Sequence, residues 1–275
     1  MEYLINYFET IPSLHRSALL VGGIAFFWML ESGLPGRLMN YKKTKHAGLN
    51  FFFTATTILV NFSLAGLLLW LSDWTQTHQW GLLYVLSGIP FWAQVLVGVA
   101  LLDLIGAYFA HWSEHKVKVL WGFHLIHHTD HEVDTTTANR HHPMESVVRF
   151  GFTLLAVWVT GASVGVIMLY QSLSVVLSQF NHANILLPQW VNQWLQWIVV
   201  TPNMHQIHHH HQLPYTDANY GNIFSLWDRI FGTYRYLPAD RVVFGVDTYP
   251  DAEQNSRLKY LLALAFKPYK SPAQK

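Results

Sequence analysis

The sequence has no cysteine, few charged residues and no basic run. Without a thiol the chain cannot form disulfides, thiolate metal sites, cysteine-bound iron–sulfur clusters or a cysteine nucleophile. Charged residues make up 12% of the 275 residues, about half of the roughly 25% usual in soluble domains, and the formal net charge is +1. This balance argues against intrinsic disorder and against a nucleic-acid-binding surface.

The sequence contains several long apolar runs without charged residues, and 51% of its residues are hydrophobic. Residues 18–30, extended by their flanks, residues 49–71 and residues 91–110 are each predicted to cross a membrane, since a span needs about 20 mostly apolar residues. The third run contains Asp103, and an ionisable group at that depth hints at function because burying it unpaired is costly.

A fourth apolar segment, at about 147–180, is too short for two full spans at about 20 residues each. It forms either a helical hairpin that enters the membrane and returns, or one span that pairs with a return through residues 190–200. The hairpin is preferred, because it keeps His182 beside the other histidines.

The loop charges predict the orientation. Four cations lie between the first two spans, whereas residues 72–90 contain no Lys or Arg; the cations are Arg37, Lys42, Lys43 and Lys45. The positive-inside rule then places the first loop in the cytoplasm, and His111 and all that follows the third span on the cytoplasmic face. We expect an all-α integral membrane helical bundle, with transmembrane helices in residues 1–100 and a cytoplasmic tail at 237–275. Residues 256–270 of that tail read as an amphipathic helix on the membrane.

Histidine is the most unusual component, with 17 residues, as many as Lys and Arg together. Eight of them form three clusters at helical spacing: His111 and His115; His124, His127 and His128; and His205, His208 and His209. Offsets of three and four residues place side chains on one helix face, about 5–6 Å apart at Cβ. Neutral imidazole binds iron, zinc, copper or nickel well.

Eight imidazoles exceed the need of one ion, so the clusters predict a di-metal site held by a cytoplasmic, His-rich helical cap. Nitrogen ligands disfavour magnesium and calcium, and leave both zinc and iron open.

These clusters, with the segments HHTDHEVDTTTANRHHPMES, FNHAN and TPNMHQIHHHHQLPYTDANYGNIFSLWDRIFGTY, resemble the fatty acid hydroxylase / sterol desaturase superfamily of membrane-bound histidine-box di-iron oxygenases. The resemblance covers about residues 101–236, which it implies to be the catalytic region. Leu186 stands where some fatty-acid hydroxylases carry a further histidine, which places the chain closer to the sterol-desaturase-like branch.

The resemblance implies a role for individual residues. The eight clustered histidines match ligand positions, and His182 in FNHAN matches a ninth. His142, in an R-x-H-P-x-E element with Arg140 and Glu145, matches a ligand or a residue that supports one. Carboxylates and amides orient metal-bound imidazoles by accepting their other N–H, and four residues are assigned that role: Asp130, Asp134, Asn184 and Asp217.

The implied activity is O2-dependent oxidation of a lipid C–H bond, by hydroxylation or desaturation, with two iron ions as cofactor and O2 as co-substrate. The sequence contains no dinucleotide-binding GxGxxG motif and no cysteine-bound cluster, so a separate electron-donor protein is expected. We expect a multi-pass protein of a bacterial inner membrane whose lipid substrate enters from the bilayer.

Two other functions fit parts of the pattern. HWSEH matches the H-x-x-E-H pattern of inverted zinc peptidases, with Glu114 as base, although on a regular helix Glu114 faces away from the ligand face. A peptidase also leaves at least five clustered histidines unexplained. A metal transporter favours ligands at mid-membrane depth on broken helices, whereas these lie in polar segments.

Overall fold

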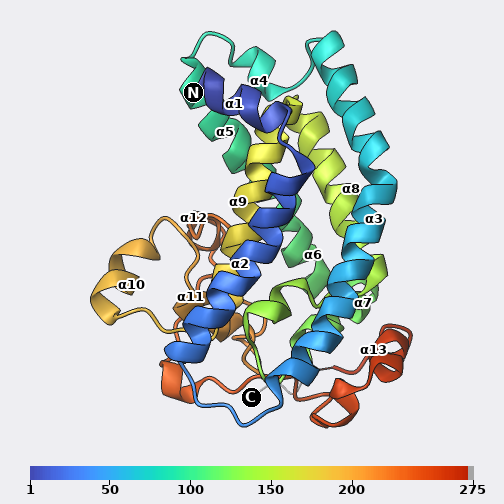
Figure 1. Cartoon of the computed structure of the whole chain (residues 1–275), viewed down its shortest axis with the longest axis vertical. Coiled ribbons are helices and arrows are strands. Elements are labelled where there is room, and N and C mark those ends of the chain that lie inside the picture. The colour runs from blue at the N-terminus through green and yellow to red at the C-terminus, as the bar shows by residue number, and fades with distance from the viewer. Residues whose placement is uncertain (272–275) are drawn as a thin grey trace.

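The structure, a computed structural model, describes residues 1–271 as a bundle of helices (Figure 1). The α-helices are α1 (Glu2–Glu9), α2 (Ser13–Gly33), α3 (Lys43–Thr77), α4 (Leu82–Val85), α5 (Phe91–Asp103), α6 (Ala110–Lys116), α7 (Lys118–His128), α8 (Pro143–Thr160), α9 (Val164–His182), α10 (Gln189–Leu195), α11 (Pro202–His208), α12 (Leu226–Ile230) and α13 (Leu258–Leu264). A π-helix, η1 (Leu104–Phe109), joins α5 to α6, and short 3-10 helices lie at η2 (Thr135–Asn139), η3 (Ala239–Arg241) and η4 (Gln254–Ser256). Within residues 1–271 the β structure is limited to two isolated bridges, so the all-α prediction is confirmed.

In the described part of the chain, four helical segments are long and apolar enough to cross a membrane: Ser13–Gly33, Lys43–Val85, Phe91–Lys116 and Val164–His182. The first three contain the three predicted spans. Helices that are distant in the sequence pack together in the interior. Leu68 of α3, Leu102 of α5 and Ile167 of α9 belong to one cluster of buried hydrophobic residues.

After the first histidines, α8 and α9 form a helical hairpin, and of the two only α9 is among the segments long and apolar enough to cross a membrane. That the hairpin enters the membrane stays a prediction. The hairpin begins at Pro143 rather than near 147, and its helices of 18 and 19 residues are about 27 Å long, close to the bilayer core thickness. Gly161 makes the turn with a left-handed backbone (φ 65°), and a Cβ there would lie 1.9 Å from the carbonyl oxygen of Trp80. The alternative return through 190–200 is not formed, because α10 is only seven residues long.

The histidine-bearing helices gather at one end of the bundle. Figure 1 shows α6, α7 and α11 in the part of the bundle away from α1 and α4, and histidines of these three helices lie near one another. The predicted histidine-rich cap therefore exists, and residues 117–201 separate its helices α6 and α11 in the sequence.

The C-terminal helix differs from its prediction. A helix over residues 256–270 was expected on the membrane surface, but α13 covers Leu258–Leu264 alone. Its Leu261 and Leu264 are buried against Trp121 and Leu125 of α7 and Phe53 of α3, so its apolar face contacts protein.

Candidate metal centre

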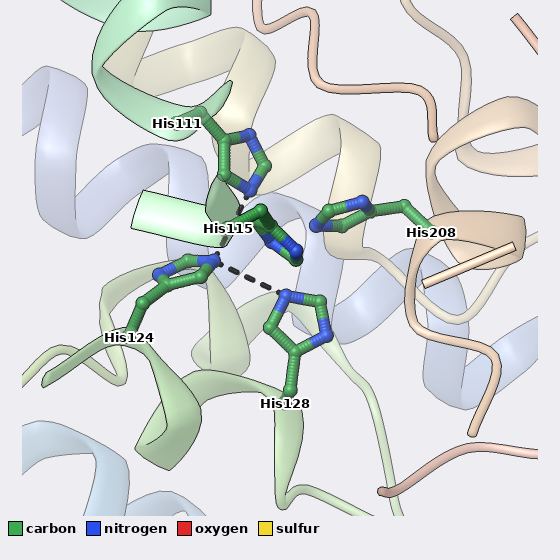
Figure 2. A group of neighbouring side chains, drawn as sticks. All are labelled: His111, His115, His124, His128 and His208. Atoms are coloured by element: carbon green, nitrogen blue, oxygen red, sulfur yellow. Dashed lines mark hydrogen bonds between the residues drawn. The ribbon is translucent and has the colours of Figure 1, made fainter. Parts of the chain in front are cut away.

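The first group of imidazoles comes from three helices. Figure 2 shows them pointing toward one another: His111 and His115 from α6, His124 and His128 from α7, and His208 from α11. Each of the five histidines offers one ring nitrogen, and these five nitrogens all lie within 4.8 Å of one another. The Nε2 atom of His124 is 3.1 Å from Nε2 of both His111 and His128.

The second group contains four imidazoles, again within 4.8 Å of one another: His127, His182, His205 and His209. The Nε2 atom of His182 is 3.1 Å from Nε2 of His127 and 3.0 Å from Nε2 of His205. All nine histidines singled out in the sequence are thus brought together, and none of them lies elsewhere.

Adjacent histidines divide between the two groups. On α7, His127 enters the second group and His128 the first; at the end of α11, His209 and His208 do the same. Successive side chains on a helix point about 100° apart, so an HH pair serves two neighbouring centres at once. The repeated HxxHH pattern therefore has a geometric reason in a paired site.

The outer nitrogens fix the rings. In five of the nine histidines Nδ1 faces an acceptor: Tyr220 O for His111, Asp217 for His115, Glu145 for His124, Ser178 O for His182 and Ala218 O for His208. An imidazole that donates through Nδ1 keeps a lone pair on Nε2, the atom that points inward.

The inner nitrogens fit a metal. Within residues 1–271, Nε2 of His115 and of His208, and both ring nitrogens of His209, are buried without a hydrogen-bond partner, which is costly for a polar atom. Two nitrogens that each lie about 2.1 Å from one ion at a right angle are about 3 Å apart, close to the four Nε2 separations given above. The donor set suits a borderline transition metal.

Burial keeps these imidazoles uncharged. Burial lowers the pKa of His124 to about 3 and holds the pKa of four others well below the usual histidine value: His127, His128, His205 and His208. Neutral imidazole is the metal-binding form, so no proton has to leave before an ion binds at neutral pH.

Only one of the four predicted orienting residues contacts a clustered imidazole. Asp217 accepts from Nδ1 of His115 at 3.2 Å and pairs with Lys116. Burial alone would raise the pKa of Asp217, but these two partners lower it to about 2, so the carboxylate is ionised.

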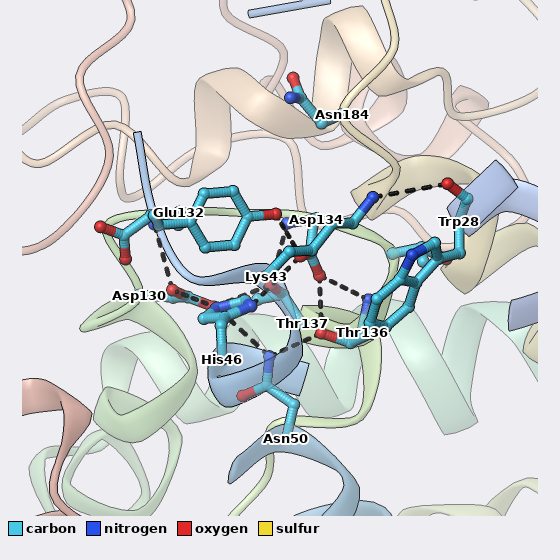
Figure 3. Close-up of polar contacts among 12 residues, drawn as sticks. Trp28, Lys43, His46, Asn50, Asp130, Glu132, Asp134, Thr136, Thr137 and Asn184 are labelled. Atoms are coloured by element: carbon cyan, nitrogen blue, oxygen red, sulfur yellow. Dashed lines mark hydrogen bonds and ion pairs between the residues drawn. The ribbon is translucent and has the colours of Figure 1, made fainter. Parts of the chain in front are cut away.

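The other three orienting residues have different partners. Asp130 and Asp134 flank His46, at 2.9 Å from Nε2 and 3.2 Å from Nδ1 (Figure 3). Asn184 hydrogen-bonds to the backbone of Arg37 through its side-chain oxygen and nitrogen. None of these three contacts a clustered imidazole in the structure, because His46 and Tyr41 occupy the two carboxylates and the backbone of Arg37 occupies the amide.

His142 lies outside both groups. Its Nδ1 accepts from the backbone N–H of Met144 and caps α8, and its ring stacks on Phe123 at 5.2 Å. His141 is nearer: its Nδ1 is 2.6 Å from Glu145, and its ring stacks on His127.

Sequence reasoning overlooked an acidic–basic layer behind the first group. Glu145 accepts a hydrogen bond from Nδ1 of His124 at 2.8 Å. Arg149 of α8 forms ion pairs with Glu145 at 3.1 Å and with Glu114 at 2.6 Å. The R-x-H-P-x-E element contained the signal for Glu145. Glu114 was expected to face away from the ligand face of its helix, and its Oε2 lies behind the first group, 3.7 Å from the outer nitrogen Nδ1 of His124. His124 belongs to α7, so this contact depends on how α6 and α7 pack.

A loop at residues 217–224 carries three of the acceptors and is held by two buried carboxylates. Asp228 accepts from the backbone N–H groups of residues 220–221 at 2.8 and 2.9 Å. Asp103 accepts from those of residues 223–224 and from Trp227 Nε1. The ionisable residue flagged within the third span thus serves as an acceptor for this loop.

A helical bundle with membrane-spanning segments and nine converging, buried imidazoles defines a membrane-bound protein with a multi-histidine metal site. The fatty acid hydroxylase family model matches residues 95–233, half of the chain, and the chain belongs to this family.

Relatives with curated names support the assignment. Alkylglycerol monooxygenase of Xenopus tropicalis is 29% identical over 53% of this chain, and ornithine lipid hydroxylase OlsE of Rhizobium tropici is 26% identical over 54%. The matches cover 31% and 44% of those proteins, so the chain spans less than half of their length. Methylsterol monooxygenase 2-2 of Arabidopsis thaliana is 24% identical, and the match covers 86% of this chain and 92% of the length of that protein. No solved structure matches the chain.

Proposed function

We propose that the chain is a membrane-bound, non-haem di-iron oxidoreductase that uses O2 and external electrons to hydroxylate or desaturate a C–H bond of a lipid. The observation that carries the proposal is the division of nine buried imidazoles into two adjacent groups. The names of the three relatives each specify a lipid hydroxylase or monooxygenase, which supports the substrate class and the reaction.

The first group of five imidazoles would hold one iron and the second group of four the other. When bound, a pair of irons supplies the redox capacity that O2 activation requires. The chain's own residues hold the inner nitrogens in place before any ion arrives: Glu145, Asp217 and the carbonyls of residues 218 and 220 fix four rings of the first group. Burial of these rings excludes bulk water from the reacting space.

The side of the membrane follows from where the loop cations lie. Residues 37–46 contact the segment after α7, since Tyr41 donates to Asp134 and His46 pairs with Asp130. The cationic loop and the metal centre therefore share one end of the bundle, which supports a cytoplasmic site under the positive-inside rule. A bacterial inner membrane is the proposed location, and a separate protein is the proposed electron donor.

The zinc hydrolase has less support. Glu114, its would-be base, pairs with Arg149 at 2.6 Å and is 1% exposed, so its carboxylate is engaged by a cation rather than free to take a proton from water. A transporter is also less favoured, because the ligands lie at one end of the bundle.

Lipid extracts from cells that express the chain, grown under labelled O2, test the reaction. We expect a lipid that carries label as a hydroxyl group, or one that has lost two hydrogens, which is absent with the His128→Ala variant. A lipid profile identical between the wild-type chain and this variant, with both proteins present in the membrane, would contradict the proposal.

A further inference from the structure

Helix α10 has its amphipathic faces reversed relative to a helix that packs on a protein core and faces water. Its outward residues include Trp190, Trp194 and the following Trp197, which are 72, 79 and 61% exposed. These lie at offsets of four and three residues, so they form one stripe along the helix. A surface helix in water places its apolar stripe inward, so this stripe faces a medium other than water.

The polar side of α10 is attached to the protein. Asn192 accepts from the hydroxyl of Thr201 at 2.7 Å, and Gln196 accepts from Tyr234 through its side chain and from Ser225 through its backbone. Thr201 is the N-cap of α11 and accepts from the backbone N–H of Met204, so α10 is bound to the start of the helix that carries His205 and His208.

The position of α10 identifies the medium. In Figure 1 it stands out from the side of the molecule, at the height of the C-terminal part of α2. That part of α2, a membrane-spanning segment, exposes Phe26 and Met29, and lipid is the medium that such a span meets. Arg229 lies 4.4 Å from the ring of Trp197, which places a cation at the rim of the stripe, as at a headgroup layer.

We propose that α10 lies in the plane of the membrane, with its tryptophan stripe inserted in the leaflet on the histidine side, and ties α11 to that leaflet. Indole favours the boundary between headgroups and acyl chains, and a short in-plane helix presents such rings side by side. Gln189 and Gln193 flank the stripe on one side, which orients that edge toward water.

The absence of cysteine allows a direct test. Trp194→Cys introduces the only thiol of the chain, and Gln193→Cys, one residue away and also exposed, is the matched control. Each purified variant, labelled with a nitroxide and placed in vesicles of phosphatidylcholine and phosphatidylglycerol, is examined by electron paramagnetic resonance for collisions with O2 and with a water-soluble nickel complex. O2 concentrates in the bilayer, whereas the nickel complex stays in water.

We expect the label at position 194 to collide at least several-fold more with O2 than with nickel, and the label at 193 to show a smaller ratio. Trp190→Cys, on the same stripe, repeats the test if the first variant does not fold. Strong nickel collisions at 190 and 194 would show a water-exposed stripe and overturn the proposal. Weak collisions with both reagents would also overturn it, since they would mean that another protein surface, such as a second copy of this chain, covers the stripe.

Discussion

His124 and Glu145 form the link between the first imidazole group and the layer behind it. The two side chains meet at 2.8 Å through Nδ1, while Nε2 of the same ring is 3.1 Å from Nε2 of His111 and of His128. A carboxylate that accepts from a ligand ring orients it and raises its basicity. Glu145 is therefore expected to govern metal affinity without being a ligand itself.

Replacement of Glu145 by Gln tests this relationship. The amide keeps the shape but loses the charge that faces His124 and Arg149, so we expect the metal affinity of the first group to fall by about 10–100-fold. Metal titration of the demetallated protein measures it. Glu253→Gln, an exposed carboxylate that pairs with Arg257 and lies outside both groups, is the control and should leave both affinities unchanged. Equal affinities for Glu145→Gln and the wild-type chain would contradict this role.

Asp228 is expected to act at a distance, through the loop it holds. It accepts from two backbone N–H groups next to the carbonyl of Tyr220, which in turn faces Nδ1 of His111. Asp228→Asn should lower the bound metal from about two ions to about one per chain under limiting supply, because the second group does not depend on this loop for its acceptors. Metal analysis of the purified variant is the measurement. Loss of both ions in parallel would point to general unfolding instead.

The ionisation of the Asp134 carboxyl group is expected to make the stability of the fold depend on pH. Burial alone would raise its pKa, but hydrogen bonds from His46, Thr136 and Tyr41 lower it below the ordinary aspartate value. A carboxyl group whose pKa is depressed by folding contributes stability above its unfolded pKa of about 3.9 and loses that contribution as the pH falls through its folded value.

The Asp134→Asn variant should therefore unfold at a lower temperature than the wild-type chain at pH 7, with a loss of about 3 kcal/mol for a broken buried pair. The difference should shrink below pH 4. Thermal unfolding in detergent at both pH values measures this, and a difference that grows on acidification would contradict it.

The apolar helices and the clustering of most of the histidines could be predicted from the sequence, because each depends on local information. The apolar runs that include Leu68 and Leu102 have a composition that only a membrane or a deep core accepts, and imidazoles at three- and four-residue offsets share a helix face whatever surrounds them. His182 is isolated in the sequence, and only the resemblance to a family identified it.

The residues that hydrogen-bond to the clustered imidazoles were harder to predict from the sequence, because their contacts depend on how the helices pack. Asp130 and Asp217 are both acidic residues near histidines in the sequence, yet one pairs with His46 and the other with His115. Nothing local distinguishes them. The same holds for α13, whose apolar residues suit a membrane surface as well as the buried cluster that they share with Trp121.

The central claim, that the two groups hold one ion each, is tested most directly by metal content per chain, measured by plasma mass spectrometry on protein purified from iron-supplemented cells. The wild-type chain should contain about two irons. A variant with both His111→Ala and His128→Ala removes two ligands of the first group only, and should retain about one. A wild-type chain with a single zinc that survives in this double variant would contradict the paired iron centre.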